Sequence, residues 1–249
     1  MNRRKILKIS GAALSASLLP GFSTAKSSDQ PDKKLKILVT GAHPDDPETG
    51  CGGIITQYVT EGHEVKLLYL TRGEAGIKGV AHEEAAKIRT KEANEANTFL
   101  NTKPIFFGQI DGDTLITKEW REKMIAVLKK ESPDILFAQW PIDSHPDHQI
   151  CSILVYNAWL RTGKKNALYY YEVMTGVQSK NFHPTDYVDI TPVIETKRKA
   201  CFIHKSQKIE DTYDRSHGKM EIFRGMEYGC KYAEGFIHHQ QSSVGYLPG

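Results

Sequence analysis

Apolar and polar residues alternate along the chain in blocks typical of strands that are each followed by a helix. Short apolar runs predict buried strands, and longer segments with apolar residues on one face predict helices. The expected strands are residues 36–40, 64–70, 104–107, 134–139, 168–173 and 187–190. The expected helices are residues 54–61, 82–100, 117–130, 149–161, 192–204 and 212–228, and an irregular tail follows from residue 229. This alternation predicts a Rossmann-like α/β domain with a mostly parallel sheet between two layers of helices.

A dense group of polar side chains follows the first apolar run, residues 37–39. The group consists of His43, Asp45, Asp46 and Glu48, and three glycines come directly after it. Open α/β sheets bind ligands at the carboxyl ends of their strands, just before a helix. Several ionisable groups at such a strand end are costly to bury without a cation. Because imidazole and carboxylate are good zinc ligands, this stretch predicts a metal site.

A second polar motif, Ser144-His145-Pro146-Asp147-His148, follows another apolar run at residues 135–137. If both runs are parallel strands of one sheet, both motifs lie at the same edge of that sheet. Together they supply His43, Asp46 and one or two of His145 and His148. Two histidines and one carboxylate, with an open position, are a recurrent set of catalytic zinc ligands.

The glycines after the first strand also suggest a dinucleotide-binding turn, and the spacing argues against it. The G-x-G-x-x-G pattern is absent, and His-Pro-Asp-Asp stands where glycines would let the backbone approach a pyrophosphate. A nucleotide cofactor is therefore not expected.

These motifs resemble those of the PIG-L or LmbE-like family of zinc-dependent N-deacetylases. The segment GAHPDDPE (residues 41–48) is similar to the family pattern AHPDD-x-E, with HPDH far downstream at residues 145–148. Further similar segments are TRGEAG at residues 71–76, RTKEANEA at residues 89–96, and residues 189–207, which end in HKSQ. The resemblance implies one LmbE-like deacetylase domain over residues 35–249. It also implies removal of an acetyl group from an N-acetylglucosamine-type sugar or glycoconjugate.

The resemblance further implies a role for each polar residue of the two motifs. The implied zinc ligands are His43, Asp46 and His148. Asp45 would be the general base that takes a proton from the attacking water. His145 would donate a hydrogen bond to the developing oxyanion, with Asp147 as the carboxylate that orients it, because a histidine held by a carboxylate keeps its proton. An alternative for Asp147 is to cap the helix that follows.

Three more residues are candidates for substrate binding. The resemblance implies that Arg89 binds the substrate. The alternative is that Arg89 lies on a solvated helix face beside Glu92. Asp111 is expected either to bind sugar hydroxyls or only to form a turn. Arg72 has no firm family counterpart, which favours a structural or rim position. Glu48 is expected either to interact with the dipole at a helix N-terminus or to support the metal ligands from behind.

The first 25 residues have the features of a secretory signal. A basic start that includes Arg3 and Arg4 is followed by an apolar run at residues 9–19 and by small residues at 23–25. The paired arginines favour a twin-arginine signal over an ordinary secretion leader. Residues 26–34 then form a polar linker. We therefore expect a periplasmic or extracellular protein acting on a glycan, with no stable membrane span after cleavage of the signal.

Charge and cysteine content narrow the range of partners. The leader carries four basic residues and no acidic one, so its removal changes the formal net charge from +3 to −1. The basic sequence pI therefore gives no support for nucleic-acid binding.

Four cysteines (Cys51, Cys151, Cys201, Cys230) are expected to be small buried hydrophobes rather than disulfides. The pair His238-His239 is expected on a surface tail. The sequence does not decide whether the chain forms a homo-oligomer.

Two other classes of function compete with a zinc amidase. A metal-dependent phosphoester hydrolase is disfavoured because two-metal sites need more ligands than these two motifs provide. A non-catalytic carbohydrate-binding protein is disfavoured because it would have no need of the base Asp45.

Overall fold

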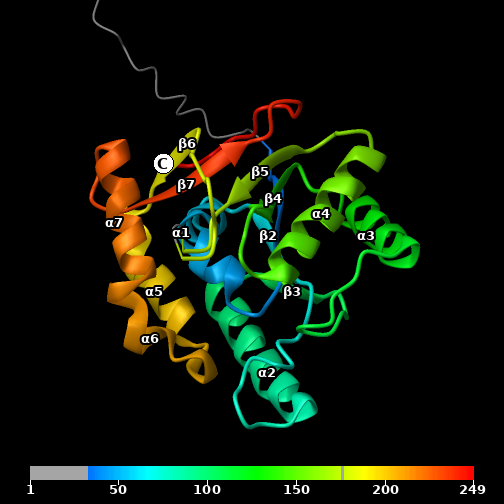
Figure 1. Cartoon of the computed structure of the whole chain (residues 1–249). Coiled ribbons are helices and arrows are strands. Elements are labelled where there is room, and N and C mark those ends of the chain that lie inside the picture. Colours follow the sequence, from blue (N-terminus) through cyan, green and yellow to red (C-terminus); the bar gives the residue numbers. More distant parts are fainter. Residues whose placement is uncertain (1–32, 175–176) are drawn as a thin grey trace, which may run out of the picture.

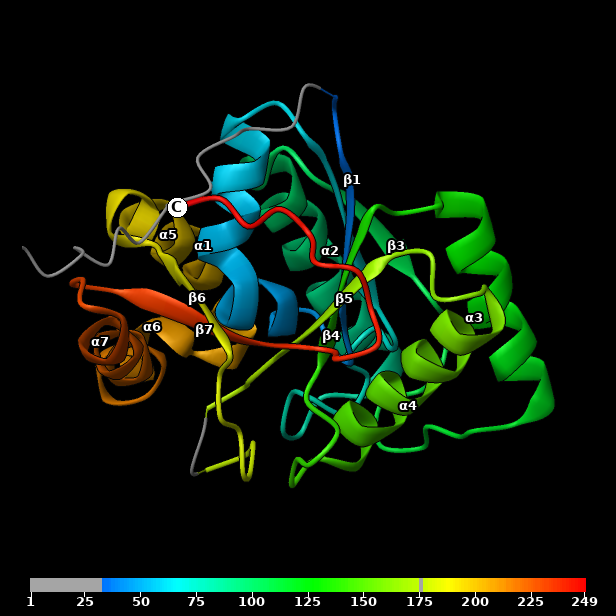
Figure 2. The ribbon, with the colours of Figure 1, turned by 90° about the horizontal axis from the view of Figure 1, so that it is seen from above.

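The computed structural model of the chain describes residues 33–174 and 177–249. The signal peptide expected at residues 1–25 and most of the linker expected at residues 26–34 lie outside the described residues. The described part forms a central sheet with helices on both faces (Figure 1). Seen from above, α3 and α4 lie on one side of the strands, and α1, α2 and α5 lie on the other (Figure 2). The expected Rossmann-like three-layer architecture is confirmed.

The described residues contain one seven-stranded sheet with the order β3-β2-β1-β4-β5-β7-β6. Its strands are β1 (Lys36–Gly41), β2 (Glu64–Tyr69), β3 (Lys103–Phe106), β4 (Ile135–Gln139), β5 (Ala167–Tyr171), β6 (Asp186–Asp189) and β7 (Ala233–His238). The first five strands pair in parallel, whereas β7 is antiparallel to both β5 and β6. The sheet is therefore mostly parallel, with an antiparallel extension at one edge.

The helices fall into two layers. They are α1 (Asp46–Thr60), α2 (His82–Leu100), α3 (Lys118–Glu131), α4 (Pro146–Arg161), α5 (Ile194–Phe202), α6 (Ile209–Thr212) and α7 (His217–Tyr228). Short 3-10 turns flank the last three: η1 (Thr191–Val193), η2 (Lys205–Gln207) and η3 (Tyr213–Arg215). One apolar core packs α1, α2 and α5 against the sheet, and a second packs α3 and α4 against its other face.

Helix α1 begins eight residues earlier than the prediction of a helix at residues 54–61, and this prediction is wrong at its start. Gly50, Gly52 and Gly53 lie inside the helix instead of forming a turn. A Cβ at Gly50 would lie 2.4 Å from Tyr171, and one at Gly53 would lie 2.3 Å from Ile190. The glycines therefore let α1 lie directly against β5 and the segment after β6, and this packing outweighs their low helix propensity.

The end of the chain also departs from expectation. The tail predicted to be irregular contains β7, and the helix predicted at residues 212–228 is divided into α6, η3 and α7. In β7, Gly235 lets the backbone lie against Pro184, since a Cβ there would be 2.8 Å from the proline ring. Pairing with two neighbouring strands supplies the stability that the short segment lacks by itself.

The topology places both polar motifs at one edge of the sheet. Strand β1 lies between β2 and β4, so the crossovers after β1 and β4 depart in opposite directions along the sheet. Ligands of open α/β sheets bind at such a switch point. His43 follows β1 directly, and His145 follows β4.

Two further expectations concern cysteines and membranes. All four cysteines are free. Cys51, Cys151 and Cys201 are buried, as predicted, whereas Cys230 is only partly buried. Among the residues that the structure describes, no helix is both long and apolar enough to span a bilayer.

Candidate metal centre and catalytic cavity

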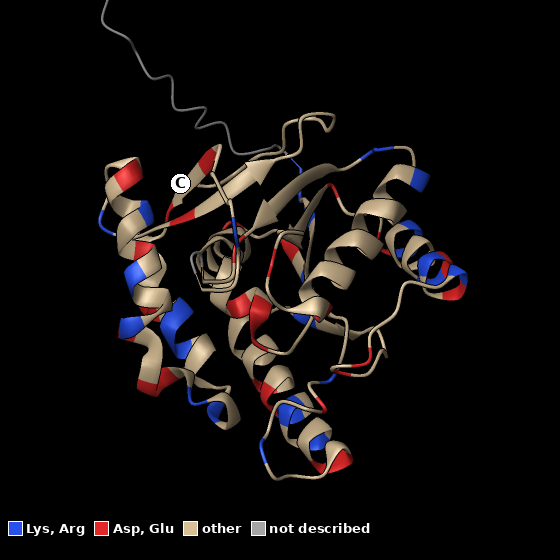
Figure 3. Cartoon of the chain, viewed as in Figure 1, with Lys and Arg blue, Asp and Glu red and all other residues tan. Residues whose placement is uncertain are grey.

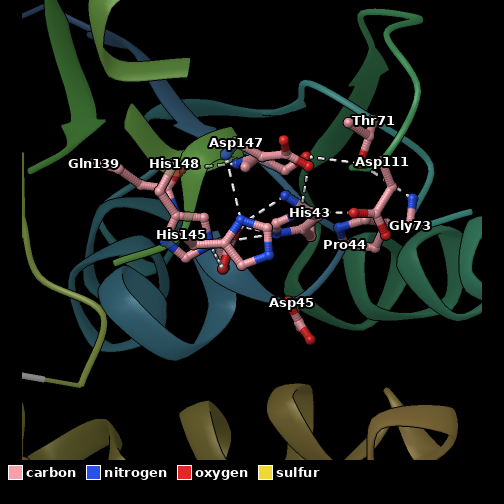
Figure 4. Close-up of polar contacts among 12 residues, drawn as sticks. His43, Pro44, Asp45, Thr71, Gly73, Asp111, Gln139, His145, Asp147 and His148 are labelled. Atoms are coloured by element: carbon pink, nitrogen blue, oxygen red, sulfur yellow. Dashed lines mark hydrogen bonds and ion pairs between the residues drawn. The ribbon is translucent and has the colours of Figure 1, made fainter. Parts of the chain in front are cut away.

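The three expected metal ligands converge at the switch point. The His43 Nδ1 atom lies 3.3 Å from His148 Nε2 and 3.3 Å from Asp46 Oδ2. His148 Nε2 lies 3.4 Å from Asp46 Oδ1. Zinc bonds of about 2.0–2.1 Å at tetrahedral angles separate the ligand atoms by about 3.3–3.4 Å. The donor atoms therefore have the chemistry and the spacing of a zinc site. Figure 4 shows the rings of His43 and His148 side by side.

Both imidazoles are held from behind by carboxylates. His43 Nε2 lies 3.2 Å from Asp111 Oδ1 and 3.2 Å from Asp147 Oδ2. His148 Nδ1 lies 3.3 Å from Asp143 Oδ1. A proton on His43 Nε2 is thereby directed to carboxylate oxygens, which leaves the Nδ1 lone pair for a metal ion. Carboxylates in this position fix the tautomer and the orientation of a metal-binding histidine.

The charge balance of the site also favours a cation. Burial lowers the pKa of His43, but hydrogen bonds to Asp111, Asp147 and Asp46 raise it well above its ordinary value. Burial raises the pKa of Asp46, but the two histidines hold it well below the usual range. Acidic residues gather around the start of α1, near the centre of the molecule (Figure 3). Buried negative charge of this density is stable only beside positive charge, so the residues fit a divalent metal ion.

Asp45 sits beside the centre in an unusual conformation. It is the N-cap of α1 and has a φ of 116°, in the left-handed region. Figure 4 shows its carboxylate directed away from the histidines, toward the helices that cover the cavity. Burial raises the pKa of Asp45 to about 6, although the positive charge of Arg89 lowers it. A carboxylate with this pKa is suited to accept a proton near neutral pH.

Arg89 is buried, with 3% exposure, so the alternative of a solvated helix face is wrong. Its Nη2 donates to Pro44 O at 2.6 Å and to Asp45 Oδ2 at 3.2 Å. A Cβ at Gly73 would lie 2.4 Å from Arg89 Nη1, and one at Gly76 would lie 2.1 Å from it. The glycines of the TRGEAG segment thus make room for the guanidinium that holds Asp45.

His145 is the N-cap of α4, and its Nδ1 accepts the Asp147 backbone N–H at 3.3 Å. The extended backbone of His145 suits a residue that precedes a proline. Burial lowers the pKa of His145, so the ring is neutral, and the occupied Nδ1 leaves the proton on Nε2. His145 therefore presents an N–H donor beside His43, with ring centroids 4.6 Å apart.

The role expected for the Asp147 side chain needs correction. Its carboxylate accepts hydrogen bonds from Gly112 N at 2.8 Å and from Thr114 Oγ1 at 2.6 Å, and it contacts His43. The Asp147 carboxylate thus contacts His43, an expected metal ligand, rather than the His145 ring. The alternative that Asp147 caps the helix is also wrong, because His145 supplies the cap.

Asp111, Glu48 and His238 were also singled out by the sequence, and they have different contacts. Asp111 is buried against His43, and its Oδ2 accepts the Ala75 N–H at 3.1 Å. Glu48 is fully buried and accepts hydrogen bonds from Tyr69 Oη at 2.6 Å and from His204 Nε2 at 3.1 Å. It therefore braces α1 from within. His238 lies in β7 rather than on an irregular tail.

The metal centre opens into a cavity of about 680 Å³. Near the metal ligands the cavity is lined by Asp45, Asp111, His145 and Arg89, and its other walls include Ala75, Gly76, Met174, Gln178, Gln207, Ile209, Thr212, Ser216 and His217. Arg72 does not line it. Arg72 pairs with Glu74 and Glu83 and faces a separate hollow of about 700 Å³ along α2, so a role in substrate binding finds no support.

Three functional candidates were missed by the sequence reasoning. Asp143 backs His148, and its place two residues before His145 was an available signal. His204 holds Glu48, and it belongs to the HKSQ segment. His217 lines the cavity from α7, and no motif marks it.

Comparisons with known proteins agree with the geometry. The family model of PIG-L, described as GlcNAc-PI de-N-acetylase, matches residues 38–159. The diacetylchitobiose deacetylase of Thermococcus kodakarensis is 31% identical over 220 residues, which cover 80% of this chain and 81% of that protein. The structure of the N,N'-diacetylchitobiose deacetylase of Pyrococcus horikoshii has a TM-score of 0.73 at 28% identity, covering 82% of this chain and 84% of that one.

A third comparison concerns the fold alone. The 4-carboxy-2-hydroxymuconate hydratase GalB of Pseudomonas putida has a TM-score of 0.73 at 20% identity, covering 86% of this chain and 99% of that one. The same architecture therefore occurs in a protein named for a different reaction, so the function has to be argued from the site.

Proposed function

Since the chain belongs to the PIG-L family of N-deacetylases, we propose that it removes the acetyl group from an N-acetylglucosamine-type sugar with the help of one zinc ion. The observation that carries this proposal is the spacing of His43, Asp46 and His148, whose donor atoms lie 3.3–3.4 Å apart. Asp45 lines the same cavity, so a candidate base faces the space in which the substrate would bind.

The residues divide the reaction among them. When bound, zinc supplies a Lewis acid that lowers the pKa of water to about 7. Asp45 takes the proton of the water that attacks the amide carbonyl, while Arg89 keeps its carboxylate in place. The Nε2 N–H of His145 donates to the carbonyl oxygen as negative charge develops on it. Asp45 then passes the proton to the nitrogen of the departing amine, so that acetate and an amino sugar are released.

The proposed substrate class rests on the cavity and on the relatives. A cavity of about 680 Å³ has the size of known small-ligand sites. The similar archaeal proteins are named for diacetylchitobiose, an N-acetylated sugar. Because residues 1–25 have the features of a secretory signal, we also propose that the substrate is a glycan outside the cytoplasm. Fractionation of cells expressing the full chain checks this location, and an uncleaved protein in the cytoplasm contradicts it.

The test of the function is acetate release by the purified protein. We expect release from N-acetylglucosamine or diacetylchitobiose with zinc, loss of release with a chelator, and recovery when zinc is returned. Metal analysis is expected to give one zinc per chain, whereas two would favour a phosphoesterase. Nitrophenyl phosphate serves as the control substrate. Sugar binding without any acetate release would indicate a non-catalytic binding protein and contradict the proposal.

A further inference from the structure

The wall of the cavity formed by α7 carries a histidine that the reaction scheme does not use. His217 is the first residue of α7, is 9% exposed and lines the cavity together with Ser216. Its Nδ1 is buried and has no hydrogen-bond partner among the described residues. Its ring neighbour Tyr213 lies 5.9 Å away between centroids, and the Tyr213 hydroxyl donates its hydrogen bond to Glu221 instead. Nε2 does not belong to the buried atoms without a partner, and His217 lines the cavity, so Nε2 is the ring nitrogen that is open to it.

A purely structural role does not account for this arrangement. Buried polar side chains in proteins nearly always have a hydrogen-bond partner, and exceptions need an explanation. Leucine or phenylalanine would fill a similar volume without a polar group that stays unpaired. The unpaired Nδ1 makes an imidazole costly for packing alone, so a contact between the other ring nitrogen, Nε2, and a ligand in the cavity is the better reason for a histidine here.

Helix α7 holds His217 in a fixed position. The buried Lys197 Nζ lies 2.8 Å from Glu221 Oε1 on α7 and 2.9 Å from Glu234 Oε1 on β7. Arg224 makes a bidentate pair with Glu172, at 2.6 and 2.8 Å. These contacts tie α7 to the sheet and to α5. Rigid support of this kind is what a contact for substrate orientation requires.

We propose that His217 binds a hydroxyl group of the substrate's sugar ring through Nε2, and thereby determines which N-acetyl sugars are accepted. This inference rests on the proposed function. A hydroxyl is the matching chemistry because it both donates and accepts, and so it pairs with either neutral tautomer of imidazole. Burial, with a smaller contribution from Lys197, lowers the pKa of His217 to about 4, so the ring is uncharged at neutral pH.

The experiment compares His217→Leu with His217→Gln, which keeps a hydrogen-bonding group. The substrates are N-acetylglucosamine and its 3-, 4- and 6-deoxy analogues. We expect His217→Leu to lower kcat/KM by about 3- to 15-fold, mainly through KM, and His217→Gln to restore part of the loss. With one deoxy analogue, the kcat/KM of the wild type should fall by the same factor relative to the parent sugar. On that analogue, His217→Leu should lower kcat/KM no further. The melting temperature of His217→Leu should equal or exceed that of the wild type. The exposed His183→Leu is the matched control.

Two outcomes overturn the inference. One is an equal loss with His217→Leu on the parent sugar and on every deoxy analogue. The other is a lowered melting temperature together with unchanged specificity, which would indicate a structural role. If the zinc-loaded wild type releases no acetate at all, the proposed function fails on its own. Calorimetric binding of the same four sugars then tests His217 separately, and equal affinity of wild type and His217→Leu refutes the contact.

Discussion

At the scale of one residue, Asp45 has a backbone conformation and a carboxylate environment that both lower stability. A non-glycine residue with a φ of 116° is strained, and its side chain is only 18% exposed. Strain and a buried carboxylate each cost stability, and such costs gather at active sites. The conformation directs the Asp45 carboxylate away from the expected metal ligands, which fits the separate roles proposed for the neighbours Asp45 and Asp46.

Asp45→Asn is the sharpest test of the base. Asparagine tolerates a positive φ, so the backbone should be preserved. We expect zinc to stay bound while turnover falls by about 10²- to 10⁴-fold, the usual contribution of a general base. Because folding raises the pKa of Asp45 to about 6, the ionised form destabilises the metal-free protein above that pH. The variant should therefore be more stable at pH 7 by about 1–3 kcal/mol, measured by denaturant unfolding. Retained turnover would remove Asp45 from the mechanism.

The same carboxylate predicts the pH dependence. The base must be ionised, so kcat/KM should fall as the pH drops through the pKa of Asp45. That pKa is about 6 in the metal-free protein, and a bound cation lowers it further. Arg89→Gln removes a charge that lowers the pKa, so the acid limb of the pH profile should move to higher pH. Lys91→Gln, an exposed change on the same helix, is the control. An unmoved limb in Arg89→Gln would contradict the pairing.

At this scale the sequence identified residue types better than their partners. Two polar motifs after two strands grouped His43 and Asp46 with one or two of His145 and His148, and the resemblance to the family selected His148. The partner of Asp147 was predicted wrongly, because the direction of a side chain in the first turn depends on where the helix begins. Helix α4 begins at Pro146, three residues before the expected start, and this turns the Asp147 carboxylate toward His43.

At the scale of elements, a buried ion network joins α5, α7 and β7. Lys197 is 2% exposed and lies between Glu221 and Glu234. The Glu234 carboxylate also accepts the backbone N–H groups of Gly53 and Ile54, so the network reaches α1. Helix α1, which begins with the proposed metal ligand Asp46, is thereby attached to β7.

Lys197→Met tests this attachment. The change leaves two buried carboxylates without their cation, and breaking a buried pair in this way costs about 3–5 kcal/mol. We expect the free energy of unfolding to fall by that amount in urea titrations. Lys199→Met, on the exposed side of α5, is the matched control and should change stability little. Equal stability of the two variants would show that the network contributes nothing.

Strands were easier to predict than the elements packed around them. Each of the six expected strands lies within two residues of an observed one, because buried runs of apolar residues have a clear pattern. The start of α1 was missed because three glycines normally indicate a turn, and only contacts with Tyr171, Lys197 and Ile190 explain them. Such tertiary contacts are not visible in a local pattern.

At the scale of the molecule, the proposed metal ion links two crossovers of the sheet. His43 and Asp46 follow β1, and His148 follows β4, so one ion would join segments about a hundred residues apart. The fold class was predictable because strands and helices alternate. The insertion of β7 between β5 and β6 was not, since pairing partners distant in sequence leave no local signal. Export and the domain limits stay predictions.

Metal removal should change global stability. A ligand that binds only the folded state stabilises it by about 2.7 kcal/mol at a hundred times its Kd. We expect zinc to raise the melting temperature of the chelated protein in calorimetry. His148→Ala should fold but show no such rise, since one of the ligands is lost. An equal rise in the variant would place the ion elsewhere.

The strand order has a consequence for synthesis on the ribosome. Strand β6 is made before β7, yet β7 lies between β6 and the rest of the sheet. Residues 186–189 therefore have no strand to join until residues 233–238 have emerged from the exit tunnel. The Rossmann-like half can assemble while translation continues, whereas the edge that anchors α7, and with it one wall of the cavity, closes only after β7 has been made.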